Sequence, residues 1–188
     1  MVEAALEINH WCAGEVMYQG TDMRTGSALE IYRSGVGRCG EEAVFVVNVM
    51  RSAGIPARPV YVPRWSHCDD NHAWVEVWCD GDWHYLGACE PEAVLDKGWF
   101  TNAASRAMMI GSRWYDRAMP DEKVIGKDGM NRIINLLGKY AKTRWITITV
   151  EDLDGTPAAG AKVRAEVMNY GEFSPIAIME ADKNGCIS

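Results

Sequence analysis

Three residues far apart in the chain have side chains that together can carry out acyl transfer. Cys39 follows the glycine-rich stretch 35–38, His72 begins an alternating stretch, and Glu90 directly precedes Pro91. A thiolate attacks a carbonyl carbon, an imidazole takes the thiol proton, and a carboxylate fixes the orientation and tautomer of the imidazole. The three residue types in this order predict a thiol enzyme that works through a thioester on Cys39.

Cys39 stands at the expected start of a helix. Residues 41–53 have apolar side chains at close to helical spacing, two glutamates in the first turn, and Gly54 at the end. Unpaired N–H groups at a helix N-terminus favour a thiolate, and the backbone N–H of Cys39 can also serve an oxyanion hole. The alternative is a buried structural cysteine, a common environment for free thiols.

His72 and Glu90 belong to an expected β-hairpin. Residues 71–79 alternate between two faces, residues 80–82 are a turn signal, and residues 83–90 form the returning strand. With a three-residue loop, His72 lies directly opposite Glu90, with Cβ atoms about 5 Å apart. A shift of one residue removes this pairing. The alternatives are a satisfied core histidine and a charged strand end.

Gln19 and Trp74 are the further candidates for the oxyanion hole or for substrate contact. An oxyanion hole commonly needs a second donor besides a backbone N–H. Gln19 lies in the polar stretch ahead of the nucleophile. Trp11 and Tyr32 are the alternative candidates for this second donor. The alternative for Gln19 is an ordinary loop residue. Trp74 shares the expected face of His72.

The cysteine content argues against a disulfide scaffold. Six cysteines in 188 residues are too few for one, although Cys79 and Cys89 on paired strands are a candidate disulfide. A second group offers the residue types that zinc prefers: His67, Cys68, His72, Cys79, His84 and Cys89. Its spacings match no common zinc pattern and contain no CxxC pair. We therefore expect no metal and no cofactor.

The elements that must position these residues indicate an α+β fold. The helix that bears Cys39 is expected to pack on an antiparallel sheet formed by a strand over 57–63 and the hairpin over 71–90. A helix is expected over 2–18, and residues 92–140 are expected to be helical and irregular, with a short helix over 131–140.

A second region begins at residue 143. Strands are expected over 145–150, 161–168 and 174–180, a pattern typical of a β-sandwich. Three strands make a marginal sheet on their own, so the natural protein is expected to continue beyond residue 188. The predicted domains are therefore 1–142 and a partial β-sandwich over 143–188.

Three segments in this order resemble the transglutaminase-like superfamily, and its bacterial members most of all: GRCGEEA (37–43), NHAWVEVW (71–78) and WHYLGACEP (83–91). The resemblance covers roughly residues 11–131. It implies a papain-like core with Cys39 as nucleophile, His72 as base and position 90 as the acid. Family members usually have Asp before the proline, whereas this sequence has Glu90, which can still accept from an imidazole N–H. The segment ITVEDLDGTPAAGAKVRAEVMNYGEFSPIAIMEADKNG (148–185) resembles the first part of a carboxypeptidase-regulatory-like or immunoglobulin-like β-sandwich.

Charge and hydropathy restrict the partners. A net charge of −7 and a pI of about 5.1 disfavour nucleic acid. No apolar run reaches the length of a membrane span, and the first residues do not form a signal peptide. In similar bacterial proteins a β-sandwich follows the transglutaminase-like domain, so the resemblance implies export to the periplasm, the cell surface or the medium.

The expected reaction is hydrolysis of a peptide or amide bond in a protein or peptide substrate. The resemblance favours hydrolysis because bacterial relatives are often protease-like. One alternative is a protein-crosslinking transglutaminase, in which a lysine amine resolves the thioester. The other is a non-catalytic module of the same fold that binds a peptide or a glycan.

Overall fold

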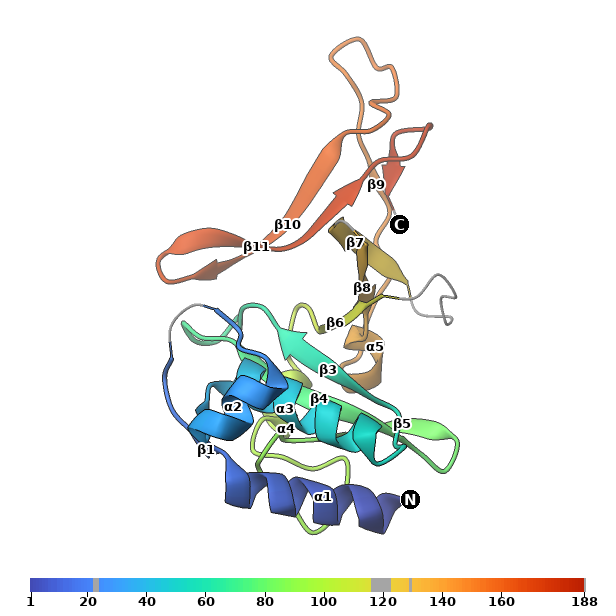
Figure 1. The fold of residues 1–188 in the computed structure, drawn as a ribbon. Helices are drawn as coiled ribbons and strands as arrows, with labels where there is room; N and C mark the ends of the chain where they lie inside the picture. The colour runs from blue at the N-terminus through green and yellow to red at the C-terminus, as the bar shows by residue number, and fades with distance from the viewer. Residues whose placement is uncertain (22–23, 116–122, 129, 188) are drawn as a thin grey trace. The chain divides into compact units, whose positions relative to one another are not determined.

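The computed structural model describes residues 1–21, 24–115, 123–128 and 130–187. The chain forms two compact units, each drawn from two segments (Figure 1). The first unit comprises Met1–Val62 and Asn71–Ala104, and the second comprises Pro63–Asp70 and Ser105–Ser188. The domain boundary expected at residue 142 stays a prediction.

The first unit alternates helices with a small sheet. Its elements are α1 (Val2–Glu15), β1 (Met17–Tyr18), α2 (Ala28–Ser34), β2 (Val36–Gly37), α3 (Cys39–Ser52), β3 (Ala57–Val62), β4 (His72–Cys79), β5 (Asp82–Leu86) and α4 (Thr101–Ala104). The strands β5, β4 and β3 lie side by side in that order and are antiparallel. Helix and sheet in one unit confirm the α+β fold.

The core of this unit lies between α3 and one face of the sheet. Successive side chains of a strand point to opposite faces. Val75, Val77 and Cys79 of β4 are fully buried in one cluster with Val46 and Met50 of α3. The opposite face of β4 begins with the side chain of His72. The helix expected over 41–53 is thus confirmed, and it covers one face of the expected antiparallel sheet.

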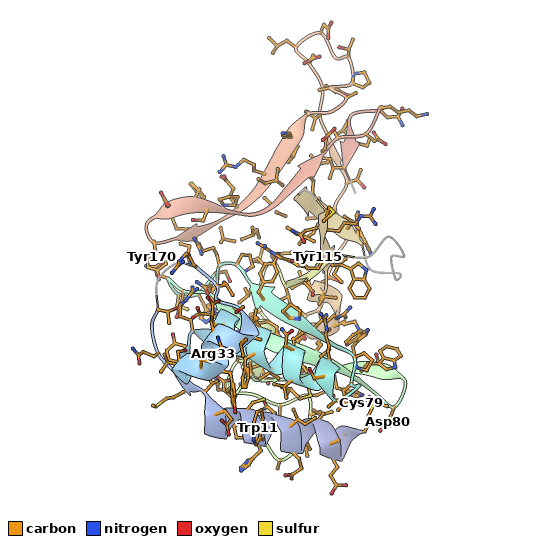
Figure 2. All side chains as sticks on the ribbon, in the orientation of Figure 1. Trp11, Arg33, Cys79, Asp80, Tyr115 and Tyr170 are labelled. Atoms are coloured by element: carbon orange, nitrogen blue, oxygen red, sulfur yellow. The ribbon has the colours of Figure 1, made fainter. Side chains whose placement is uncertain are left out.

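The β4–β5 hairpin differs from the expected one by one residue. Asp80 and Gly81 form a two-residue turn with φ of 52° and 93°, and Cys79 pairs with Asp82 (Figure 2 labels Cys79 and Asp80). Positive φ at both central residues is the geometry that a tight hairpin requires. β5 ends at Leu86, so the expected pairing of His72 with Glu90 across the ladder is wrong.

The second unit is built mainly from strands. Its elements are β6 (Gly111–Trp114), β7 (Val124–Asp128), β8 (Asn131–Asn135), α5 (Leu137–Tyr140), β9 (Ile148–Thr149), β10 (Lys162–Asn169), β11 (Glu172–Glu180) and β12 (Cys186–Ile187). β8 lies between β6 and β7, β10 pairs with β11, and β9 pairs with β12, all antiparallel.

The expected helical character of residues 92–140 is wrong, whereas two of the expected C-terminal strands are confirmed. Residues 92–140 were expected to be helical and irregular, but they contain three strands, and the expected helix over 131–140 divides into β8 and α5. Short strands depend on their neighbours more than on their own pattern, and Gly126 interrupts the alternation of β7. The strands expected over 161–168 and 174–180 are confirmed as β10 and β11. Their assignment to a β-sandwich stays a prediction.

Within the described ranges, every helix is too short or too polar to cross a lipid bilayer.

Candidate active site

Cys39 is the first residue of α3 and is partly exposed. The helix begins there because Glu41 reaches back, and its Oε2 accepts a hydrogen bond of 3.0 Å from the backbone N–H of Arg38. The backbone N–H groups of Glu41 and Glu42 both donate to the Arg38 carbonyl. The thiol therefore stands at the positive end of a 14-residue helix, the position that favours a thiolate.

Glu41 also binds the loop that precedes the nucleophile. Its carboxylate accepts from Thr21 Oγ1 at 2.6 Å and from the Gly26 N–H at 3.2 Å, while Arg38 donates to Thr21 and to the Arg24 carbonyl. Burial raises the pKa of Glu41, but these hydrogen bonds outweigh it and leave the pKa below its ordinary value. The ionised carboxylate thus fixes the loop against the start of α3.

Gln19 lies next to the segment that leads into Cys39. β1 pairs in parallel with β2, and the ladder continues with a 2.9 Å hydrogen bond from the Gln19 N–H to the Gly37 carbonyl. Gln19 is exposed. The rivals Trp11 and Tyr32 instead pack against each other, with ring centroids 6.2 Å apart.

His72 lies at the same end of the α3–β3–β4 layer as Cys39. α3 is about 20 Å long, and the chain turns back through β3, which covers about 17 Å. β3 therefore ends beside the start of the helix (Figure 1). Its last residue, Val62, pairs with His72, the first residue of β4. The topology brings the cysteine and the histidine to one end of the unit.

The imidazole of His72 is packed among aromatic rings. Its centroid lies 4.6 Å from the ring of Trp99, 4.9 Å from Phe100 and 5.8 Å from Trp74. Trp74 is fully buried and stacks on Phe100 at 4.8 Å. Trp74, expected as a substrate-contacting residue, thus lies behind His72, whereas Trp99 is 65% exposed.

Trp99 connects His72 to Glu90. The indole Nε1 of Trp99 donates to both carboxylate oxygens of Glu90, at 3.0 Å each. Burial raises the pKa of Glu90, and the hydrogen bond from Trp99 opposes that rise. Although the ladder does not pair them, His72 and Glu90 contact the same indole side chain.

The interaction between Glu42 and Glu90 shows that Glu90 lies near the first turn of α3. Glu42 follows Cys39 by three residues, about one helical turn, and is only 4% exposed. Burial raises the pKa of Glu42 to about 8, and the charge of Glu90 contributes to the rise. Two carboxyl groups therefore share the region between the start of α3 and the segment that follows β5.

Asn9 of α1 holds the segment that carries Glu90. Its Nδ2 donates to the Gly87 carbonyl at 2.9 Å, and its Oδ1 accepts from the Cys89 N–H at 3.0 Å. Asn9 is 1% exposed. The Glu90 N–H donates back to the Gly87 carbonyl, and a Cβ on Gly87 would lie 2.8 Å from that of Glu90. Only glycine permits this close approach.

The other thiols differ from Cys39 in their surroundings. All six cysteines are free, so the candidate disulfide between Cys79 and Cys89 is absent. Burial raises the pKa of Cys12 to about 12 and also raises the pKa of Cys89. Both therefore stay protonated at neutral pH. In the part of the chain that the structure describes, no group of three or more His, Cys, Asp or Glu side chains could hold a metal ion.

Sequence reasoning missed three residues of this site: Asn9, Glu42 and Trp99. Asn9 lies on a helix far from the motifs, and its role depends on a contact across 78 residues. Glu42 reads as an ordinary acidic residue of a first helical turn. Trp99 lies in the stretch expected to be helical and irregular, where no pattern indicates a partner for Glu90.

Comparison with known proteins finds a family model that matches part of the chain. Residues 1–88 match the model of the transglutaminase-like superfamily. This match includes Cys39 and His72 and confirms the resemblance seen in the sequence motifs. No curated protein matches the sequence.

Three solved structures are similar to parts of this chain. A suspected cysteine protease from Cytophaga hutchinsonii is 20% identical, with a TM-score of 0.40 over 70% of this chain. LapG of Legionella pneumophila is 17% identical, with a TM-score of 0.42 over 50% of this chain. A TGase is 13% identical, with a TM-score of 0.39 over 64% of this chain. The chain spans 51%, 58% and 35% of these three proteins.

Proposed function

From the match of residues 1–88 to the transglutaminase-like superfamily, we propose that this chain is a thiol enzyme that transfers acyl groups through Cys39. One observation carries the proposal. Cys39, whose thiol is partly exposed, is the first residue of the largely buried helix α3. It lies at the end of the first unit where β4 begins with His72. A nucleophile at a helix N-terminus and an imidazole at the same end are what acyl transfer to a thiol requires.

The proposed reaction has two steps. Sγ of Cys39 attacks a carboxamide or peptide carbonyl carbon, and His72 takes the thiol proton. The carbon–nitrogen bond breaks, and His72 gives the proton to the leaving amine, so a thioester remains on Cys39. Water then attacks the thioester, with His72 as general base, and releases the acid and the free thiol.

Glu90 has the role of orienting the imidazole in this proposal. The triad arrangement needs a carboxylate that keeps the histidine in one tautomer. The burial of Glu90, and its hydrogen bonds from Trp99 beside His72, support this assignment. Trp99 then acts as a positioning residue that contacts both members of the pair.

The proposed oxyanion hole combines the backbone N–H of Cys39 with the side chain of Gln19. Gln19 follows β1 directly and is held against Gly37 by a backbone hydrogen bond. Its side chain is exposed on the loop that Glu41 fixes. Two donors of this kind stabilise the negative oxygen of a tetrahedral intermediate.

Hydrolysis of a peptide or amide bond is the outcome we favour. A crosslinking reaction, in which a lysine amine replaces water, uses the same thioester. Incubation of a glutamine-containing peptide with a labelled amine separates the two outcomes, because only crosslinking incorporates the label. The net charge of −7 supports a protein or peptide rather than a nucleic acid as the partner.

Export to the periplasm, the cell surface or the medium belongs to the same proposal. It rests on the sequence resemblance of residues 148–185 to β-sandwich modules. Fractionation of cells that express the full-length gene tests it, because retention in the cytoplasm contradicts export.

The first experiment is the rate of Cys39 alkylation by iodoacetamide as a function of pH, followed by mass spectrometry. We expect Cys39 to react fastest of the six thiols and to react well below pH ~8.5. The exposed Cys68 serves as the ordinary thiol, and the buried Cys12 as the unreactive one. His72→Ala should slow Cys39 at neutral pH and leave Cys68 unchanged.

An unreactive Cys39, or a Cys39 that reacts like Cys68 in both proteins, contradicts the catalytic proposal. The remaining function is then a binding module of the same fold.

A further inference from the structure

The segment 63–70, which joins β3 to β4, is bound by the tip of the β10–β11 hairpin. Asn169 Nδ2 donates to the Trp65 carbonyl at 3.1 Å and to the Cys68 carbonyl at 2.9 Å. The Tyr170 N–H donates to Asp69 Oδ1 at 2.6 Å. Figure 2 marks Tyr170 at this tip. Three hydrogen bonds thus join residues about one hundred positions apart.

Asn169 is built into this contact. Its side chain is 0% exposed, and a side-chain amide offers two N–H groups, the number needed for two backbone carbonyls. The turn that presents it is a two-residue hairpin turn, with φ of 51° at Tyr170 and 77° at Gly171. Such turns have one well-defined geometry. The donors are therefore held in place by the hairpin itself.

The bound segment is itself compact. The Trp65 N–H donates to the Asp70 carbonyl, and the Asp70 N–H donates to the Cys68 carbonyl, both at 2.9 Å. Trp65 is 2% exposed. The segment has no helix or strand of its own. These hydrogen bonds and those from the hairpin tip help to hold its conformation.

The bound segment ends next to the proposed catalytic base. Val62 and His72 are paired across β3 and β4, so residues 63–71 are the connection that closes this hairpin. One residue, Asn71, separates the bound segment from His72. Asp70 and His72 are therefore joined through a single intervening residue.

We propose that the tip of the β10–β11 hairpin is a positioning device for His72, acting through the segment 63–70. The hairpin tip then has a role beyond that of a spacer. The catalytic consequence rests on the proposed function, while the positioning of His72 does not. Loss of the contact frees the segment, because weakly held connections open locally before the fold unfolds.

The variant that tests the contact is Asn169→Asp. It has nearly the same shape, but it replaces the two N–H donors by an oxygen that faces two carbonyls. The matched control is Asn184→Asp, the same change at an exposed position in the turn before β12. A second variant, Asp69→Ala, removes the acceptor for Tyr170 from an exposed residue of the segment, so it does not disturb the core.

Two measurements follow the variants. The first is the rate of tryptic cleavage after Arg64, which reports the open population of the segment. We expect a rise of about tenfold or more in Asn169→Asp and Asp69→Ala, and no change in Asn184→Asp. The second is the imidazole spectrum of His72, assigned among the four histidines with His72→Gln. We expect its nitrogen resonances to move in the first two variants only.

Two outcomes overturn the inference. In the first, cleavage after Arg64 does not rise, so the hairpin tip does not hold the segment. In the second, cleavage rises but the His72 resonances stay unchanged, so the segment does not position the histidine. Neither measurement uses the reactivity of Cys39. A failure of the proposed function appears separately, as an unreactive Cys39 in the unmodified protein.

Discussion

The indole Nε1 of Trp99 lies 3.0 Å from each carboxylate oxygen of Glu90. The same indole ring lies 4.6 Å from the imidazole of His72. One side chain therefore both orients the carboxylate and covers the histidine. Removal of the N–H alone separates these two roles.

Trp99→Phe keeps an aromatic ring beside His72 and removes the donor to Glu90. Burial already raises the pKa of Glu90, and the lost hydrogen bond is the interaction that opposes this rise. We expect the acidic limb of the Cys39 alkylation profile to move up by about 1 pH unit. Trp78→Phe, at the far end of β4, is the control and should leave the limb in place. An unchanged limb in Trp99→Phe would show that Glu90 does not act on His72.

The raised pKa of Glu42 predicts that the stability of the folded protein depends on pH. Its pKa is raised to about 8 in the folded protein, from 4.5 in the unfolded chain, by burial and then by Glu90. The folded state thus binds the proton more tightly, and stability falls as the pH rises from about 4.5 to about 8. We expect the unmodified protein to lose on the order of 2–4 kcal/mol between pH 5 and pH 8.

Glu42→Gln should lose much less over the same range, because glutamine does not ionise. Urea unfolding at the two pH values measures the difference. Glu3→Gln, on the exposed part of α1, should behave like the unmodified protein. Equal pH dependence in all three proteins contradicts the prediction.

Asn9→Ala should destabilise the first unit. The change leaves the Gly87 carbonyl and the Cys89 N–H without their partner in a buried place. Each such group costs about 1–3 kcal/mol, so we expect a loss of about 2–4 kcal/mol in urea unfolding. Asn48→Ala, which removes a hydrogen bond on the exposed side of α3, is the control. A similar small loss in both variants means that Asn9 does not hold the segment before Glu90.

The ion pair between Arg58 and Glu76 is almost completely buried. Arg58 Nε and Glu76 Oε2 are 2.6 Å apart, with 1% and 2% of the two side chains exposed. Glu76→Gln removes this negative charge from beside a buried guanidinium, and we expect a loss of about 3–5 kcal/mol in denaturant unfolding. Glu166→Gln breaks the exposed pair with Arg164 and should cost at most about 1 kcal/mol. Similar losses would show that burial does not decide the cost.

Motifs and helical spacing were enough to predict the α3 helix, the strand leaving it and the alternation of β4. These features depend on local pattern. Cys39 at the start of a helix follows from the glycines before it and the glutamates after it. The helix was correctly predicted for this reason, although it begins two residues earlier than expected, at Cys39 itself. The α+β fold that packs α3 on the sheet was also correctly predicted.

The spatial arrangement of His72 and Glu90 could not be predicted from the sequence. It depends on whether the β4–β5 turn has two or three residues, and the signal Asp80-Gly81-Asp82 fits either. With two residues the strand ends at Leu86, and Glu90 meets the histidine region through Trp99 instead. Contacts between distant segments, such as Asn9 with Gly87, have no local pattern that reveals them.

The contact of Asn169 with residues 65 and 68 also restricts how this chain can change during evolution. A different C-terminal segment keeps this contact only if it presents two N–H donors at the same two carbonyls. Substitutions that remove the amide of Asn169 should therefore be rare among descendants of this protein. The two parts then behave as one heritable unit, although a modular architecture suggests that they are exchangeable.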